Sequence, residues 1–127
     1  MSAHKDHSPG FLAIVDEART RIREISVADT IAAVEGGDAR LLDVREDNEF
    51  HAGHARGAEH LGKGIIERDI ETVAPDKDAP LILYCGGGYR AALAAESLQR
   101  MGYTDVASMA GGWRAWLEAN APVEGMK

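Results

Sequence analysis

The amino-acid sequence predicts an α/β fold built on a mainly parallel β-sheet. Short strand-like segments alternate with segments of helical periodicity along the 127 residues, a pattern typical of parallel strands joined by helical crossovers. The clearest strand, Leu81–Tyr84, is apolar at every position. A strand without polar alternation is buried on both faces, so we expect helices on both sides of the sheet.

Two amphipathic helices are expected first along the chain. Ser8 and Pro9 form a helix start, and apolar residues then recur at helical spacing as far as Ile25. Ser26 starts a second, shorter helix, which a glycine pair at 36–37 ends. Whether the first helix docks a partner or only covers apolar surface is open at this point.

The rest of the chain predicts the remaining strands and helices. Strands are expected at residues 40–45, 58–61, 81–84 and 105–109. Helical segments are expected at 46–51, 64–74 and 91–101, with a last helix that carries Trp113, Trp116 and Leu117. A tight loop, residues 85–90, joins the apolar strand to the strongest of these helices.

Length and charge narrow the class of protein. A chain of 13.6 kDa is one domain, and about two-thirds of its unfolded surface can be buried. The net charge of −7 argues against nucleic-acid and polybasic membrane-surface partners. The apolar stretches are far shorter than the ~20 residues of a membrane span, and no apolar signal region follows the N-terminus. We therefore expect a cytoplasmic protein with neither nucleic-acid nor membrane partners.

The loop after the apolar strand carries the candidate chemistry. Cys85, the only cysteine, ends that strand, and ligands of open α/β sheets bind at the carboxyl ends of strands. The next helix directs its N-terminus at the loop, and glycines at 86–88 allow several N–H groups to converge on one point. Arg90 adds a positive charge. Together these features favour a nucleophilic thiolate at Cys85.

Each part of the loop also has a purely structural interpretation. The cysteine can be a packed apolar residue, the glycines a plain connection and the arginine a solvated helix residue. Their convergence within six residues favours the functional interpretation. A phosphate-binding nucleotide loop is disfavoured because no Lys-Ser/Thr pair follows the glycines. A single cysteine also excludes an intramolecular disulfide and a thiolate-rich zinc site.

Four segments, in order, carry a resemblance to one family. They are residues 41–46, 53–58, 84–91, and 111–113 followed by Trp116. These segments resemble the early strand motif, the Gly-His-Ile-Pro-Gly-Ala segment, the active-site loop and the closing motif of single-domain rhodaneses, with Ala-Arg in place of Ile-Pro. The resemblance covers about residues 25–121, which we interpret as a rhodanese-like domain. Residues 1–24 are then an N-terminal tail and amphipathic helix, and residues 122–127 a C-terminal tail.

The resemblance implies a fold and an activity. Rhodaneses have a five-stranded, mainly parallel sheet with helices on both faces, and they move a sulfane sulfur. Carried over, Cys85 is the nucleophile that holds the sulfur as a persulfide, and Arg90 is the second catalytic residue, closing the loop and adding charge. The loop N–H groups of Gly86, Gly87, Gly88, Tyr89 and Arg90 would hold the outer sulfur.

The same resemblance implies partners. The donor is thiosulfate or another persulfide, and the acceptor is cyanide or a thiol, with a sulfur-relay protein as a further candidate partner; no cofactor is expected. The uncharged loop interior predicts modest thiosulfate turnover. Tyr89 is a candidate gate of the pocket or contact for the acceptor. Arg45 is a candidate substrate contact, although it could instead pair with a nearby acid. His51, His54 and His60 lack a metal-ligand spacing, so no metal is expected.

Two other interpretations compete with a sulfurtransferase: an enzyme that acts on phosphate or arsenate, and a silent binding module. Phosphatases and arsenate reductases of this fold place five residues between Cys and Arg and usually have His before the Cys. Here four residues separate Cys85 from Arg90, and Tyr84 precedes the cysteine. A catalytically silent rhodanese-like binding or regulatory module typically lacks the loop cysteine, so the sequence favours a sulfurtransferase.

Overall fold

The computed structural model describes residues 7–125, and the outermost residues of both predicted tails, 1–6 and 126–127, lie outside the described residues. In chain order the elements are α1 (Pro9–Arg19), β1 (Arg23–Ile25), α2 (Val27–Glu35), β2 (Arg40–Asp43), α3 (Asp47–Ala52), β3 (His54–Ala55), β4 (Glu59–His60), the 3-10 helix η2 (Lys63–Ile65), α4 (Ile66–Val73), β5 (Leu81–Tyr84), α5 (Tyr89–Arg100), β6 (Val106–Met109), α6 (Gly112–Glu118) and β7 (Val123–Glu124).

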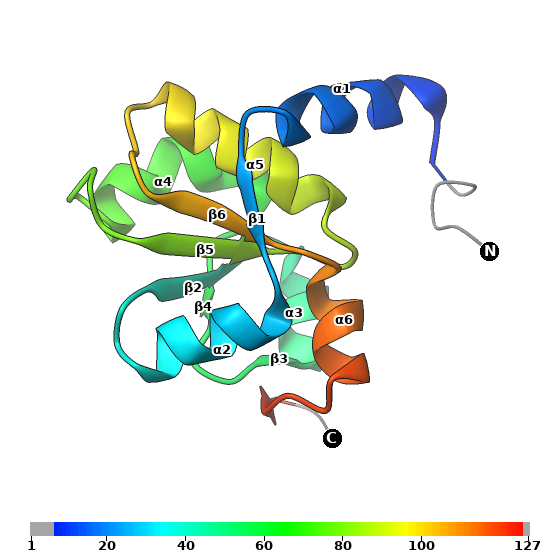
Figure 1. The fold of residues 1–127 in the computed structure, drawn as a ribbon, viewed down its shortest axis with the longest axis vertical. Coiled ribbons are helices and arrows are strands. Elements are labelled where there is room, and N and C mark those ends of the chain that lie inside the picture. The colour runs from blue at the N-terminus through cyan, green and yellow to red at the C-terminus, as the bar shows by residue number, and fades with distance from the viewer. Residues whose placement is uncertain (1–6, 126–127) are drawn as a thin grey trace.

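The principal sheet has five strands in the order β1-β6-β5-β2-β4. Every neighbouring pair in it is parallel, and helices lie on both faces of the sheet (Figure 1). The predicted fold class is therefore confirmed. Because β5 is the central strand, its carboxyl end lies in the middle of one sheet edge, where neighbouring strands and helices can supply surrounding groups.

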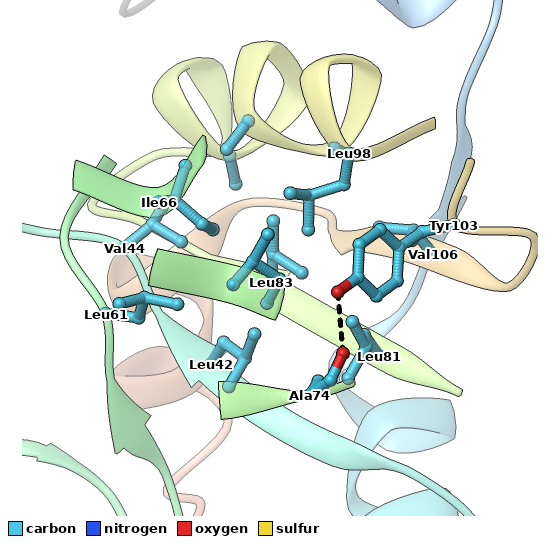
Figure 2. Packing of buried hydrophobic residues seen from close by; sticks show 14 of the residues in the cluster. Leu42, Val44, Leu61, Ile66, Ala74, Leu81, Leu83, Leu98, Tyr103 and Val106 are labelled. Carbon is cyan, nitrogen blue, oxygen red and sulfur yellow. Dashed lines mark hydrogen bonds between the residues drawn. The ribbon is translucent and has the colours of Figure 1, made fainter. Parts of the chain in front are cut away.

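The strand residues alternate between two apolar clusters. In Figure 2, Leu42, Leu81 and Leu83 point toward α4 and α5, where they meet residues such as Ile66 and Leu98. On this side Tyr103 donates a 2.6 Å hydrogen bond from its hydroxyl to the carbonyl oxygen of Ala74, drawn as a dashed line in Figure 2. This bond satisfies both buried polar groups within the apolar layer.

The opposite face of the sheet has its own cluster. Leu41, Ile82 and Tyr84 pack there with Trp116 of α6, and apolar residues of α2 cover the edge of the group. All four residues of β5 are buried, as the unbroken apolar run predicts. Trp116 also donates from its indole N–H to the Pro122 carbonyl oxygen at 2.7 Å, which ties α6 to the chain that follows it.

The N-terminal helix is shorter than its periodicity predicts. The apolar spacing continues to Ile25, but α1 ends at Arg19 and residues 23–25 form β1, paired with 107–109 of β6. Ile22 packs against one apolar cluster and Ile25 against the other. Ile22, just before β1, and Ile25, at its end, therefore both pack on the core although the segment is not helical. The pairing of residues 23–25 with β6 decides in favour of a strand over a longer helix.

The next helix start is confirmed in atomic detail. Ser26 accepts a hydrogen bond from the Asp29 N–H at 3.0 Å, so it is the N-cap of α2. Beyond α6, β7 pairs antiparallel with β3 in a small second sheet. Within residues 7–125, no helix combines the length and apolar character that crossing a bilayer requires.

Candidate active site

The sulfur of Cys85 lies at the carboxyl end of β5 and accepts backbone hydrogen bonds. The N–H of Gly88 donates to it at 3.1 Å and the N–H of Ala91 at 3.3 Å. Gly88 has φ +99°, a left-handed conformation that lets the chain turn back over the sulfur. Helix α5 begins at Tyr89, so Tyr89 and Arg90 stand in its first turn and not in the loop predicted from the sequence.

The start of α6 supports the loop from the other side. The N–H of Trp113 donates to the carbonyl oxygen of Cys85 at 2.7 Å, and that of Arg114 to the carbonyl oxygen of Gly86 at 3.1 Å. Gly112 makes this approach possible: its φ is +56°, and a Cβ there would lie 2.4 Å from the Cys85 carbonyl oxygen. The Gly-Gly-Trp segment thus positions the loop as well as turning the chain.

The charge of Arg90 is paired. Its Nη1 lies 2.8 Å and its Nη2 3.2 Å from the two carboxylate oxygens of Glu49. The hydrogen bond from Arg90 lowers the pKa of Glu49 from its ordinary 4.5, and the same bond raises the pKa of Arg90. The guanidinium also lies over the loop, since a Cβ on Gly86 would be 3.1 Å from Arg90 Nη2.

Glu49 is a site residue that the sequence reasoning missed. It lies on α3, and its carboxylate also accepts the Glu46 N–H at 2.9 Å in a capping box that starts the helix. The acidic residues at N-cap and N3 were a signal for that box. The pairing of Glu49 with Arg90, 41 positions later, has no local signal, because only the tertiary fold brings α3 to the loop.

A cavity of about 540 Å³ opens over the loop. It is lined by His7, Phe11, Cys85, Gly86, Gly87, Tyr89, Arg90, Gly111, Arg114, Ala115 and Glu118. The structure thus gathers most of the sequence-predicted site residues around one space, and Gly88 donates its N–H to the Cys85 sulfur. Cys85 is only 1% exposed, and it lines this cavity. The α1 and α6 residues of the lining were not anticipated.

Arg45 does not line that cavity. Its guanidinium donates to the Asp43 carboxylate at 2.8 Å and to the Gly53 carbonyl oxygen at 2.7 Å, and both charged side chains are buried. The guanidinium also lies 4.8 Å above the Trp113 ring. These contacts correspond to the second possibility raised from the sequence, a pairing with a nearby acid, and they connect β2 to the start of α6.

The neighbouring aromatic and histidine side chains have structural contacts. The Tyr84 hydroxyl accepts the Ala55 N–H at 3.0 Å, and burial together with the Asp43 charge raises the pKa of Tyr84. The Nδ1 atom of His54 is hydrogen-bonded to the Phe50 carbonyl oxygen at 2.9 Å, and the Nε2 atom of His60 is hydrogen-bonded to the Arg45 carbonyl oxygen at 2.8 Å. Among residues 7–125, no group of three or more His, Cys, Asp or Glu side chains is arranged to hold a metal ion.

Known proteins are similar to this chain in sequence and in fold. The chain is 34% identical over 99 residues to the thiosulfate sulfurtransferase GlpE of Shewanella oneidensis, covering 78% of this chain and 96% of that protein. A Rhodopseudomonas palustris protein, described as of unknown function and a possible tyrosine phosphatase, superimposes with a TM-score of 0.81 at 34% identity, covering 93% of this chain and 96% of the other.

A further similar structure is the polysulfide-sulfur transferase homodimer of Wolinella succinogenes, with a TM-score of 0.77 at 29% identity. The match covers 90% of this chain and 86% of that one. Residues 26–119 match the family model of the rhodanese-like domain, a range that contains β2, the loop and α6. The chain therefore belongs to the rhodanese-like domain family.

Proposed function

We propose that this protein is a sulfurtransferase that carries a sulfane sulfur on Cys85. One observation supports the proposal above others: Cys85 lines a cavity, and its sulfur accepts hydrogen bonds from the N–H groups of Gly88 and Ala91 at 3.1 and 3.3 Å. Backbone N–H groups directed at a sulfur stabilise negative charge on it without contributing a titratable group. Such a cradle suits both a thiolate and an anionic persulfide.

The loading step balances without an external acid, base or oxidant. The Cys85 thiolate attacks the outer sulfur of thiosulfate, a new S–S bond forms, and the old S–S bond breaks as sulfite departs with its electron pair. In the proposal, the N–H groups of residues 86–90 then hold the outer sulfur of the Cys85 persulfide. Sulfite is a stable leaving anion, so a neighbouring general acid is not required.

The transfer step returns the enzyme to its starting state. A thiophilic acceptor, cyanide or a thiolate, attacks the outer sulfur, and Cys85 leaves again as a thiolate. Arg90 has the role of holding the loop in shape over this exchange. Its charge is shared with Glu49, and the residues between Cys85 and Arg90 carry no charge. Attraction for a dianion is therefore weak, so the proposal includes modest thiosulfate turnover and organic or protein persulfides as alternative donors.

Phosphate-ester hydrolysis is the activity to test against, because one similar structure is described as a possible tyrosine phosphatase. The loop has four residues between Cys85 and Arg90. A single sulfur atom is smaller than a tetrahedral phosphate, so a loop of this length suits the sulfur better than the phosphate. We therefore expect no Cys85-dependent release of phosphate from p-nitrophenyl phosphate.

The test is intact-mass measurement of the reduced protein after brief exposure to thiosulfate. We expect a gain of one sulfur atom, its removal by cyanide, and no gain in the Cys85→Ser variant, which differs by a single atom at the same buried position. A gain only with an organic persulfide keeps the sulfur chemistry and reassigns the donor. No gain with either donor would contradict the proposal and favour a catalytically silent binding module.

A further inference from the structure

The segment before the family domain forms one wall of the cavity. The His7 ring centroid lies 5.3 Å from that of Phe11 and 4.4 Å from that of Tyr89, while Phe11 and Tyr89 are 6.1 Å apart. The guanidinium of Arg19, at the end of α1, lies 4.9 Å from the centroid of the Tyr89 ring. Three aromatic rings and a cation therefore cluster beside the Cys85 loop.

The packing of α1 holds this wall in place. Val15 and Ala18, one and two turns beyond Phe11, are fully buried, and α1 lies along α5, the helix that begins at Tyr89 (Figure 1). Phe11 thus shares the inward face of α1, whereas Ile14 lies on its outward face and is 53% exposed. The wall is part of the folded structure, although it lies outside the matched residues 26–119.

Helix α6 contributes a charged part of the lining. It is formed by Arg114, Ala115 and Glu118 of α6. Arg114 makes no ion pair with any side chain of residues 7–125, whereas the Arg90 guanidinium is paired with Glu49. The unpaired positive charge of the lining therefore comes from α6, whereas the aromatic rings come from the N-terminal segment and α5. Glu118 adds a negative charge one helical turn further along α6.

The size and lining of the cavity indicate an organic substrate. A volume of about 540 Å³ is within the range of about 300–1,000 Å³ that is typical of sites for organic ligands, and it is far more than cyanide or thiosulfate needs. Aromatic rings contribute little binding free energy toward a small hydrated anion. They bind an apolar group through contact area and ring stacking. A carboxylate on that group would pair with Arg114 while its sulfur reached Cys85.

We propose that His7 and Phe11 are specificity-determining residues, which adapt the site to an organic thiol that carries an apolar body and a carboxylate as the sulfur acceptor. This inference rests on the proposed sulfurtransferase function. In the step concerned, the acceptor thiolate attacks the outer sulfur of the Cys85 persulfide. The S–S bond to Cys85 breaks, the acceptor leaves as a persulfide anion, and Cys85 regains its thiolate, so atoms and charge balance.

The experiment measures single-turnover discharge of the preformed Cys85 persulfide by intact mass. The acceptors are 4-(mercaptomethyl)benzoate, benzyl mercaptan without the carboxylate, and cyanide. For Phe11→Ala we expect the ratio of the 4-(mercaptomethyl)benzoate rate to the cyanide rate to fall about tenfold, the loss of one aromatic contact. Ile14→Ala, on the exposed side of the same helix, is the matched control and leaves the ratio unchanged.

Two further variants make the test independent of helix folding. His7→Ala lies outside α1 and should lower the same ratio, and Arg114→Gln should lower the preference for 4-(mercaptomethyl)benzoate over benzyl mercaptan. A persulfide that forms normally but discharges with unchanged ratios in Phe11→Ala and His7→Ala overturns this inference alone. Failure of the wild-type protein to load sulfur from any donor overturns the proposed function, and this inference with it.

Discussion

The close approach of α6 to the Cys85 loop depends on Gly112, and Gly112→Ala is a direct test of it. A Cβ at this position would lie 2.4 Å from the Cys85 carbonyl oxygen and 2.9 Å from both the carbonyl carbon and oxygen of Gly86. All three contacts are backbone atoms, which cannot rotate away as a flexible side chain can. The substitution must therefore separate α6 from the loop or distort both.

The loss of stability expected for Gly112→Ala has two contributions. A residue with a side chain at φ +56° loses about 1–2 kcal/mol relative to glycine. Separation also breaks the hydrogen bonds from the Trp113 and Arg114 N–H groups to the loop carbonyls, each worth about 1 kcal/mol. Gly112→Ala should therefore lower the free energy of unfolding by about 3–4 kcal/mol, or the Tm by roughly 10–15 °C for a domain of this size.

Gly37→Ala is the matched control, because Gly37 has φ +75° but nothing within 4 Å of its added Cβ. It isolates the conformational cost, and its Tm should fall by only about 5 °C. Thermal unfolding followed by circular dichroism compares the two variants, and persulfide loading by mass should be slower in Gly112→Ala alone. A Gly112→Ala protein as stable as Gly37→Ala, with normal loading, would refute the packing argument.

Two other contacts give predictions. Glu49→Gln removes the negative charge beside Arg90 and should raise kcat/KM for thiosulfate about two- to fivefold, the size of a partly exposed ion pair; an unchanged value would contradict the charge-sharing argument. Because the bond from Arg90 lowers the pKa of Glu49 from 4.5, the pair stabilises the protein above that pH, and this contribution is lost as pH falls through the lower folded-state pKa. Urea unfolding should show the wild-type advantage over Glu49→Gln shrinking in that range. Arg45→Met leaves the fully buried Asp43 carboxylate without its ion pair and should cost about 3–5 kcal/mol in urea unfolding. If Arg45 instead binds substrate, the donor KM rises while stability is retained.

Local sequence signals correctly predicted the elements whose residue pattern is compatible with only one kind of secondary structure. The apolar run Leu81–Tyr84 is buried on both faces as its composition requires, and Ser26 caps α2 through its own side chain. The signals failed where two structures satisfy the same pattern. Residues 23–25 continue a helical spacing, yet they form a strand because the edge of β6 is available for pairing.

The sequence by itself determined the centre of the site, because its parts are consecutive. A strand, Cys85, three glycines and a helix start bring N–H groups close to one sulfur through local geometry, and contacts with α6 then hold that loop in place. The tertiary structure alone decided what surrounds that sulfur. Glu49 reaches Arg90 across 41 positions, and Phe11 comes from outside the family domain to the cavity wall. Such contacts arise from how helices pack on the sheet, and helical periodicity records only which face is apolar, never which neighbour that face will meet.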